Sequence, residues 1–147
     1  MSKVVSLSQI FQENTVDFPE KMYPNDISKK KVPQGVEVYE IQGPFFFGAA
    51  NILRDLLNSI SHPPKIFILR MRFIPMIDAS GMYGIEEFYS QCKKKGIVLF
   101  LSGVHGQTQQ DLKKFGLIDS IGEQRIFPDI DLALAKAEEM VSSRGLS

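Results

Sequence analysis

The sequence predicts an α/β fold, with strands and helices alternating along a single domain. Short apolar runs of strand length recur between longer segments whose apolar residues repeat at helical spacing. Strands joined through helices form right-handed crossovers, so the sheet is expected to be mostly parallel. The 147 residues, 44% of them apolar, are enough for one domain with a core of its own.

The first unit joins two strands through one helix. Residues 36–41 alternate between apolar and polar, as in a strand with one less deeply buried face. A Gly-Pro pair breaks this strand, and leucines and isoleucines at helical spacing predict a helix over residues 49–59. A Pro-Pro pair ends that helix. The continuous apolar run 66–69 then predicts a strand that is covered on both faces.

The second unit adds another helix and another strand. Residues 80–95 carry apolar side chains on one side of a predicted helix. Three lysines occupy its last turn, where they interact favourably with the helix dipole, and Gly96 suits its C-terminal cap. Residues 97–101 form a further apolar run, which predicts a second buried strand.

Three shorter elements complete the predicted domain. A short helix is expected over residues 104–115, capped by Gly116. Residues 125–127 predict a short final strand. A last helix opens at Asp129 and keeps one apolar face as far as Val141.

The first 35 residues differ from the rest of the chain. They contain three prolines, polar clusters and the basic run 29–31. We interpret the segment as a linker or arm with room for one edge strand. We interpret the basic run as solvated surface in preference to a membrane-facing patch.

Composition limits the classes of partner and compartment. Lys+Arg and Asp+Glu balance at 17 each, so no large field of one sign is available to hold nucleic acid. Cys92 is the only cysteine, which excludes an internal disulfide and suits a reducing compartment. No apolar run is long enough to cross a membrane, and the N-terminal residues lack a signal-peptide core. By itself the chain is expected to be soluble and cytoplasmic.

Candidate catalytic and metal-binding residues are isolated from suitable partners. His62 and His105 have no Cys, Asp or Glu at a metal-ligand spacing, so we interpret them as surface residues. Cys92 lies on an apolar helix face, as a small buried hydrophobe would. The pairs at 86–87 and 138–139 are adjacent glutamates, which diverge by about 100° on a helix and are expected at solvated surface. We therefore predict no catalytic residue, metal or cofactor.

The loop at residues 78–81 is the most informative segment. Asp78 and Ser80 come just before an apolar periodic run, which is a helix N-cap signal. A helix N-terminus also offers free N–H donors to an anion, and loops at the carboxyl ends of parallel strands often bind ligands or partners. A structural cap and a regulatory or docking site are both compatible with this spacing.

Several segments together resemble the STAS domain found at the cytoplasmic C-terminus of SulP anion transporters. The stretch 35–50, reading GVEVYEIQGPFFFGAA, resembles the opening of that domain. The stretch 77–81, reading IDASG, resembles its signature loop. Residues 95–103 and 115–117 also fit, and the resemblance covers about residues 36–141.

This resemblance implies a mixed sheet with helices packed largely on one face. It also implies a non-catalytic cytoplasmic regulatory and interaction domain of a SulP-type secondary anion transporter, for sulfate or a related anion. The domain would occupy residues 36–143, after an arm (1–35) that follows a membrane domain in cis and before a tail (144–147). Such a domain lies at the cytoplasmic face of the inner (plasma) membrane, as part of an integral membrane protein.

The resemblance also predicts a binding surface and leaves several partners open. The binding surface is expected to comprise Asp78, Ala79, Ser80, Gly81, Met82, Phe46, Phe47 and Gly48. A cytosolic protein partner, a nucleotide and self-association are all compatible with the family.

The same family includes anti-sigma factor antagonists, in which a kinase phosphorylates the serine directly after the loop aspartate. The residue at that position here is Ala79, which has no hydroxyl. Ser80, one place later, is the remaining candidate for phosphorylation. A stand-alone antagonist-like signalling protein is the alternative function, and a small hydrolase or transferase using Asp78 and Ser80 is a third.

Overall fold

The computed structural model describes residues 31–42, 49–59 and 61–143. Strands and helices alternate as the sequence predicts. The described elements are β1 (Val36–Gln42), α1 (Ala49–Ser59), β2 (Ile66–Phe73), α2 (Ala79–Lys94), β3 (Val98–Ser102), α3 (Gly106–Phe115), α4 (Leu117–Ile121), the 3₁₀ turn η4 (Glu123–Arg125), β4 (Ile126–Phe127) and α5 (Ile130–Ser143). The short helix α4 was not predicted, and neither was the 3₁₀ turn that follows it. The arm, the tail and the residues Phe46, Phe47 and Gly48 lie outside the described residues, apart from positions 31–35 of the arm.

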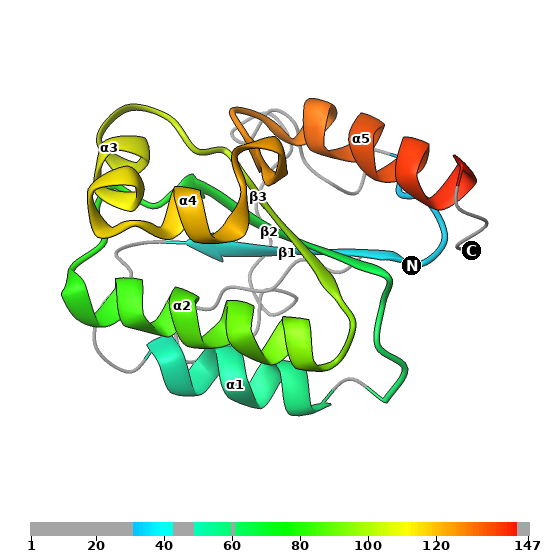
Figure 1. Cartoon of the computed structure of the whole chain (residues 1–147), viewed down its shortest axis with the longest axis horizontal. Helices are drawn as coiled ribbons and strands as arrows, with labels where there is room; N and C mark the ends of the chain where they lie inside the picture. The colour runs from blue at the N-terminus through cyan, green and yellow to red at the C-terminus, as the bar shows by residue number, and fades with distance from the viewer. Residues whose placement is uncertain (1–30, 43–48, 60, 144–147) are drawn as a thin grey trace.

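The described strands form one sheet in the order β1–β2–β3–β4. All three pairings are parallel, as expected for strands joined through helices. The carboxyl ends of the strands therefore lie together at one edge of the sheet, on the left in Figure 1. The antiparallel component implied by the mixed sheet of the family is not found among these four strands.

The helices cover the two faces of the sheet unequally. One hydrophobic cluster joins the sheet to α1, α2, α3 and α4, and a second joins the other face to α5. Figure 1 shows α1 and α2 below the sheet and α5 above it. Four of the five described α-helices thus share one face, which confirms the predicted α/β class with helices largely on one side.

The larger cluster is built around Phe67 on β2. Its ring stacks on Tyr39 with centroids 4.7 Å apart and meets Phe88 of α2 edge-on at 5.0 Å. All three side chains are at most 2% exposed. Burial of each aromatic contributes hydrophobic stabilisation, and the ring geometry adds about 0.5–1.5 kcal/mol for each pair.

A polar row crosses the other face of the sheet near the carboxyl ends of the strands. Glu40, Arg70 and Ser102 are register partners on β1, β2 and β3. Glu40 and Arg70 are each 2% exposed, and the Glu40 carboxylate also lies 3.2 Å from the Nε atom of Arg72. These ion pairs allow β2 to continue to Phe73, four residues past the predicted end, because its charged side chains have a buried partner.

Candidate functional site

The loop between β2 and α2 is anchored on both sides before it reaches Asp78. The Ile74 amide donates to the Met71 carbonyl at 3.1 Å, which turns the chain away from the strand. The buried Thr108 hydroxyl of α3 donates to the Ile74 carbonyl at 3.2 Å. Ile77 is 7% exposed and packs into the larger cluster. The loop is therefore held in one position against the core and α3.

Asp78 is the N-cap of α2. Its backbone is extended (φ −87°, ψ −179°), and its Oδ1 atom accepts the Gly81 amide at 2.9 Å. The same oxygen accepts the Ser80 hydroxyl at 2.9 Å. A carboxylate at this position also interacts favourably with the helix dipole. The predicted cap is confirmed for Asp78, while Ser80 lies within the first turn of the helix.

The predicted binding residues separate into accessible and buried groups. Asp78 and Ala79 are exposed and Ser80 is half-buried, so these three reach the surface. Gly81 and Met82 are buried, and Met82 is only 3% exposed. The last two support the loop from the core side.

Two exposed apolar side chains flank this loop, and sequence reasoning did not single them out. Met76 is 51% exposed and Tyr83 is 61% exposed. The Tyr83 ring packs edge-on against Phe115 of α3, with centroids 5.0 Å apart, which restrains its orientation. The available signal was position: Tyr83 lies off the apolar face of its helix.

We define the docking surface as Met76, Asp78, Ala79, Ser80 and Tyr83. It combines two large apolar side chains with a carboxylate and a hydroxyl on a loop of fixed conformation. Apolar anchors beside a few polar groups are typical of protein–protein contact sites. A rigid loop also loses little conformational entropy on binding.

The structure describes the surroundings of the cysteine and of both histidines. Cys92 is buried, and burial raises the pKa of its thiol from the ordinary 9.0 to about 12, which disfavours the nucleophilic thiolate. His62 is exposed and hydrogen-bonds its neighbour Ser61 at 3.2 Å. His105 is exposed at the start of α3. These positions agree with the predicted surface histidines and buried cysteine.

The adjacent glutamates 86 and 87 of α2 diverge as expected. Glu86 is exposed, whereas Glu87 forms an ion pair with Arg54 of α1 at 2.7 Å. No group of three His, Cys, Asp or Glu side chains in the described ranges could hold a metal ion. None of the described helices has the length and apolar character needed to cross a bilayer.

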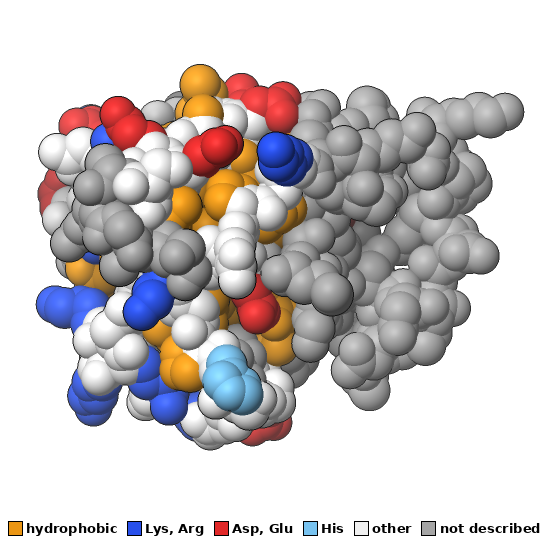
Figure 2. Space-filling view, turned by 90° about the vertical axis from the view of Figure 1, so that its right-hand side faces the viewer, with side chains coloured by type: hydrophobic (Ala, Val, Ile, Leu, Met, Phe, Trp, Pro, Cys, Tyr) orange, Lys and Arg blue, Asp and Glu red, His pale blue; other side chains and the backbone are white. Residues whose placement is uncertain are grey.

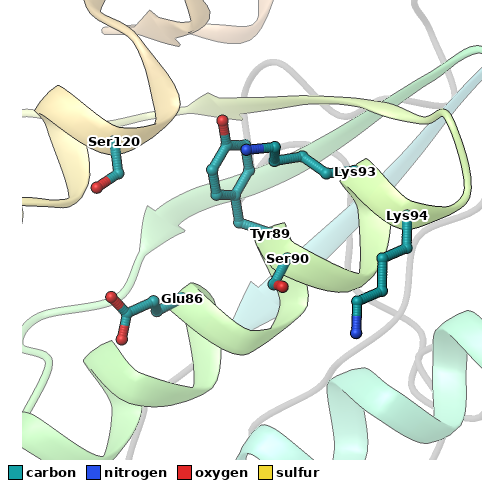
Figure 3. A pocket seen from close by; sticks show the side chains of 6 residues that line it. All are labelled: Glu86, Tyr89, Ser90, Lys93, Lys94 and Ser120. Carbon is teal, nitrogen blue, oxygen red and sulfur yellow. The ribbon is translucent and has the colours of Figure 1, made fainter.

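A shallow groove of about 440 Å³ lies between α2 and α4. Its lining comprises Glu86, Tyr89, Ser90, Lys93, Lys94 and Ser120. Figure 3 shows Lys93 reaching along the Tyr89 ring, whose centroid is 5.4 Å from the ammonium nitrogen, while Lys94 points away. Two lysines and one glutamate line the groove, so it carries both signs of charge.

A family model described as the STAS domain matches residues 28–133 of the chain. A Bacillus subtilis protein named as a sulfate transporter, YvdB, is 31% identical over 106 residues. That alignment covers 71% of this chain and 20% of the YvdB protein. The chain thus spans about a fifth of the length of the curated relatives it matches.

Solved structures give the same assignment. A sulfate transporter family protein from Wolinella succinogenes is 51% identical with a TM-score of 0.78, covering 81% of this chain and 98% of that one. The STAS domain of a SulP transporter from Vibrio cholerae is 34% identical with a TM-score of 0.70, covering 77% and 88%. The resemblance drawn from residues 35–50, 77–81, 95–103 and 115–117 is confirmed. The chain belongs to the STAS domain family and is homologous to the STAS domains of SulP anion transporters.

Proposed function

We propose that this chain is the non-catalytic regulatory and interaction domain of a SulP-type secondary anion transporter for sulfate or a related anion. The observation that carries the proposal is its similarity to relatives named as sulfate transporters, of which it spans only a fifth. A transporter's remaining length would include a membrane domain in cis. The domain would then lie at the cytoplasmic face of the membrane and act on transport or assembly through contacts.

The docking surface is the part of the domain that we propose makes those contacts. Its loop is held by Thr108 and by the Asp78 cap, so it presents a fixed shape to a partner. Met76 and Tyr83 supply apolar area that costs free energy while it stays in water. A cytosolic protein or another part of the transporter would cover this area.

The test is anion uptake by cells that express the complete transporter with altered docking residues. The double variant Met76→Ala, Tyr83→Ala is expected to lower sulfate uptake severalfold while membrane levels of the protein stay normal. Leu132→Ala is the matched control, because Leu132 is 52% exposed but lies on α5. Normal uptake by both the double variant and the control variant would contradict a docking role for Met76 and Tyr83.

The stand-alone antagonist is not favoured by the residues of the loop. Ala79 is exposed at the position where an antagonist has its phosphorylated serine. The Ser80 hydroxyl donates a hydrogen bond to the Asp78 carboxylate. A phosphate on Ser80 would remove this hydrogen bond and add negative charge beside the Asp78 carboxylate, so it would weaken the cap. Phosphopeptide mass spectrometry of the native protein tests this switch, and absence of phosphorylated Ser80 across growth conditions would eliminate it.

A hydrolase or transferase would require Asp78 or Ser80 to act on a substrate. Asp78 Oδ1 already accepts two hydrogen bonds as a cap. The homologous family is not known for catalysis, and we propose that this chain does no chemistry of its own. Asp78→Asn separates the cases, because it keeps the cap but would abolish turnover by an enzyme that uses this carboxylate.

A further inference from the structure

The end of α2 remote from the docking surface carries a cluster of exposed lysines. Lys93, Lys94 and Lys95 end the helix, and Lys65 precedes β2; all four side chains are exposed. A backbone hydrogen bond brings these segments together, since the Val98 amide, just after the turn that follows α2, donates to the Lys65 carbonyl at 3.0 Å. We call these four lysines the basic edge.

Charges of opposite sign are separated on this side of the molecule. Figure 2 shows Lys and Arg side chains gathered over the lower left, where α2 ends, and most visible Asp and Glu side chains along the top, near α5. None of the four lysines forms an ion pair within the described part of the chain. The whole sequence has a net charge of zero, so attraction to an anionic partner depends on this separation.

We propose that the basic edge lies against the anionic headgroups of a phospholipid bilayer. All four cations are lysines, whose flexible stems and single charges suit a diffuse anionic surface. Recognition of one fixed phosphate or carboxylate favours the planar fork of arginine instead. The groove beside Lys93 and Lys94 also contains the carboxylate of Glu86, which opposes a small anion there.

The proposal rests on the proposed function, and it gives the domain an orientation relative to the membrane. A domain tethered to a membrane transporter needs only weak attraction to hold one face toward lipid, because its local concentration at the bilayer is high. The docking surface lies at the other end of α2. With the basic edge on the lipid, the docking surface points away from the bilayer, where a cytosolic partner can reach it.

Sedimentation of the 147-residue chain with lipid vesicles tests the proposal. The chain is expected to partition onto phosphatidylcholine vesicles that contain phosphatidylglycerol, and not onto phosphatidylcholine alone. High salt is expected to release it. A lysine near an anionic surface contributes about 1 kcal/mol, or about fivefold in partitioning, so K93Q/K94Q is expected to weaken binding roughly 25-fold.

K113Q/K114Q is the matched control, because Lys113 and Lys114 are exposed in the last turn of α3, as Lys93 and Lys94 are in α2. Equal effects of the two double variants, or no partitioning at low salt, would overturn the proposal. Displacement from vesicles by millimolar inorganic phosphate would point to a small-anion site and overturn it too. Binding of polyglutamate to the chain as tightly as the vesicles bind would also overturn the proposal, because it would indicate that the partner of the basic edge is an acidic protein.

These outcomes do not decide the proposed function. Vesicle binding tests only the basic edge of the isolated chain. Whether the chain is part of a transporter is tested separately, by anion uptake and by cell fractionation.

Discussion

Glu40 and Arg70 lie opposite each other on β1 and β2, each 2% exposed, with Glu40 Oε1 3.7 Å from Arg70 Nη1. The same carboxylate lies 3.2 Å from Nε of Arg72. Removing one partner of a buried ion pair is costly, because the other charge stays buried without compensation. This network sits on the face of the sheet that α5 covers, apart from the docking surface.

Glu40→Gln is therefore expected to destabilise the fold strongly. Loss of the carboxylate leaves two arginines facing a neutral amide, and the expected cost is about 3–5 kcal/mol. Glu87→Gln is the comparison, because its ion pair with Arg54 is about 40% exposed on both sides and contributes at most about 1 kcal/mol. Urea unfolding followed by circular dichroism measures both. Equal midpoints for the two variants would contradict the importance of the buried pair.

Asp78→Ala is expected to cost about 1 kcal/mol of folding stability, because the Gly81 amide and the Ser80 hydroxyl lose their shared acceptor. Asp78→Asn keeps an acceptor oxygen in the same place and should remain close to the unaltered protein. Thermal unfolding of the two variants checks this. Identical melting temperatures for the Asp78→Ala and Asp78→Asn variants would show that the cap contributes nothing to stability.

Gly103→Ala is expected to be much more harmful than Gly96→Ala. Both glycines have φ +74°, so both substitutions force an alanine into the left-handed region, at about 1–2 kcal/mol. A Cβ at Gly103 would also lie 2.7 Å from the backbone nitrogen of Arg72, whereas the space at Gly96 is open. The additional overlap is expected to cost about 1–3 kcal/mol more. Equal decreases in the urea midpoints of the two variants would show that the backbone at Arg72 can move away from the added Cβ without a cost in stability.

The buried Cys92 predicts a loss of stability at high pH. Burial raises the pKa of its thiol from 9.0 to about 12, so the folded chain holds this proton where the unfolded chain releases it. The contribution is complete below pH 9.0 and is lost as the pH rises toward about 12. Burial and a hydrogen bond to Glu37 raise the pKa of Tyr39 as well, which adds to the same trend.

Unfolding of the native chain and of Cys92→Ala across this alkaline range measures the effect. The variant is expected to show a shallower decline with pH, since it lacks the contribution of the Cys92 thiol and keeps that of Tyr39. Native Cys92 is also expected to resist thiol reagents until urea is added. Rapid labelling of Cys92 in the folded chain would contradict the burial of its thiol.

Most of the fold followed from local patterns in the sequence. The helix predicted over residues 49–59 matches α1, and the strand ends differ from the predicted ones by a few residues. The largest error at a strand end was at Arg70, a charged residue that directly follows the apolar run 66–69 and lies inside β2. Its partner Glu40 is 30 positions earlier, and only the parallel register of β1 and β2 brings the two together. The short helix α4 was missed because its five residues are too few to show a helical period.

The candidate site was predicted in part. The cap signal at Asp78 was correct, because it depends on residues within one turn of helix. The exposure of Tyr83 was indicated by its position off the apolar face of the helix, but that of Met76 depends on how the loop before α2 packs, which a single sequence does not reveal. Met82 was expected at the binding surface although it also belongs to the apolar side of the predicted helix, and it lies 3% exposed in the core. Whether the accessible loop residues bind a partner stays a prediction.

The measurement that tests the central claim most directly is an immunoblot of fractionated native cells with an antibody against this domain. The chain alone has a mass of 16.6 kDa. Membership of a SulP-type transporter predicts a band several times heavier, found in the membrane fraction. A soluble band near 16.6 kDa would contradict that account and direct attention to the free signalling protein.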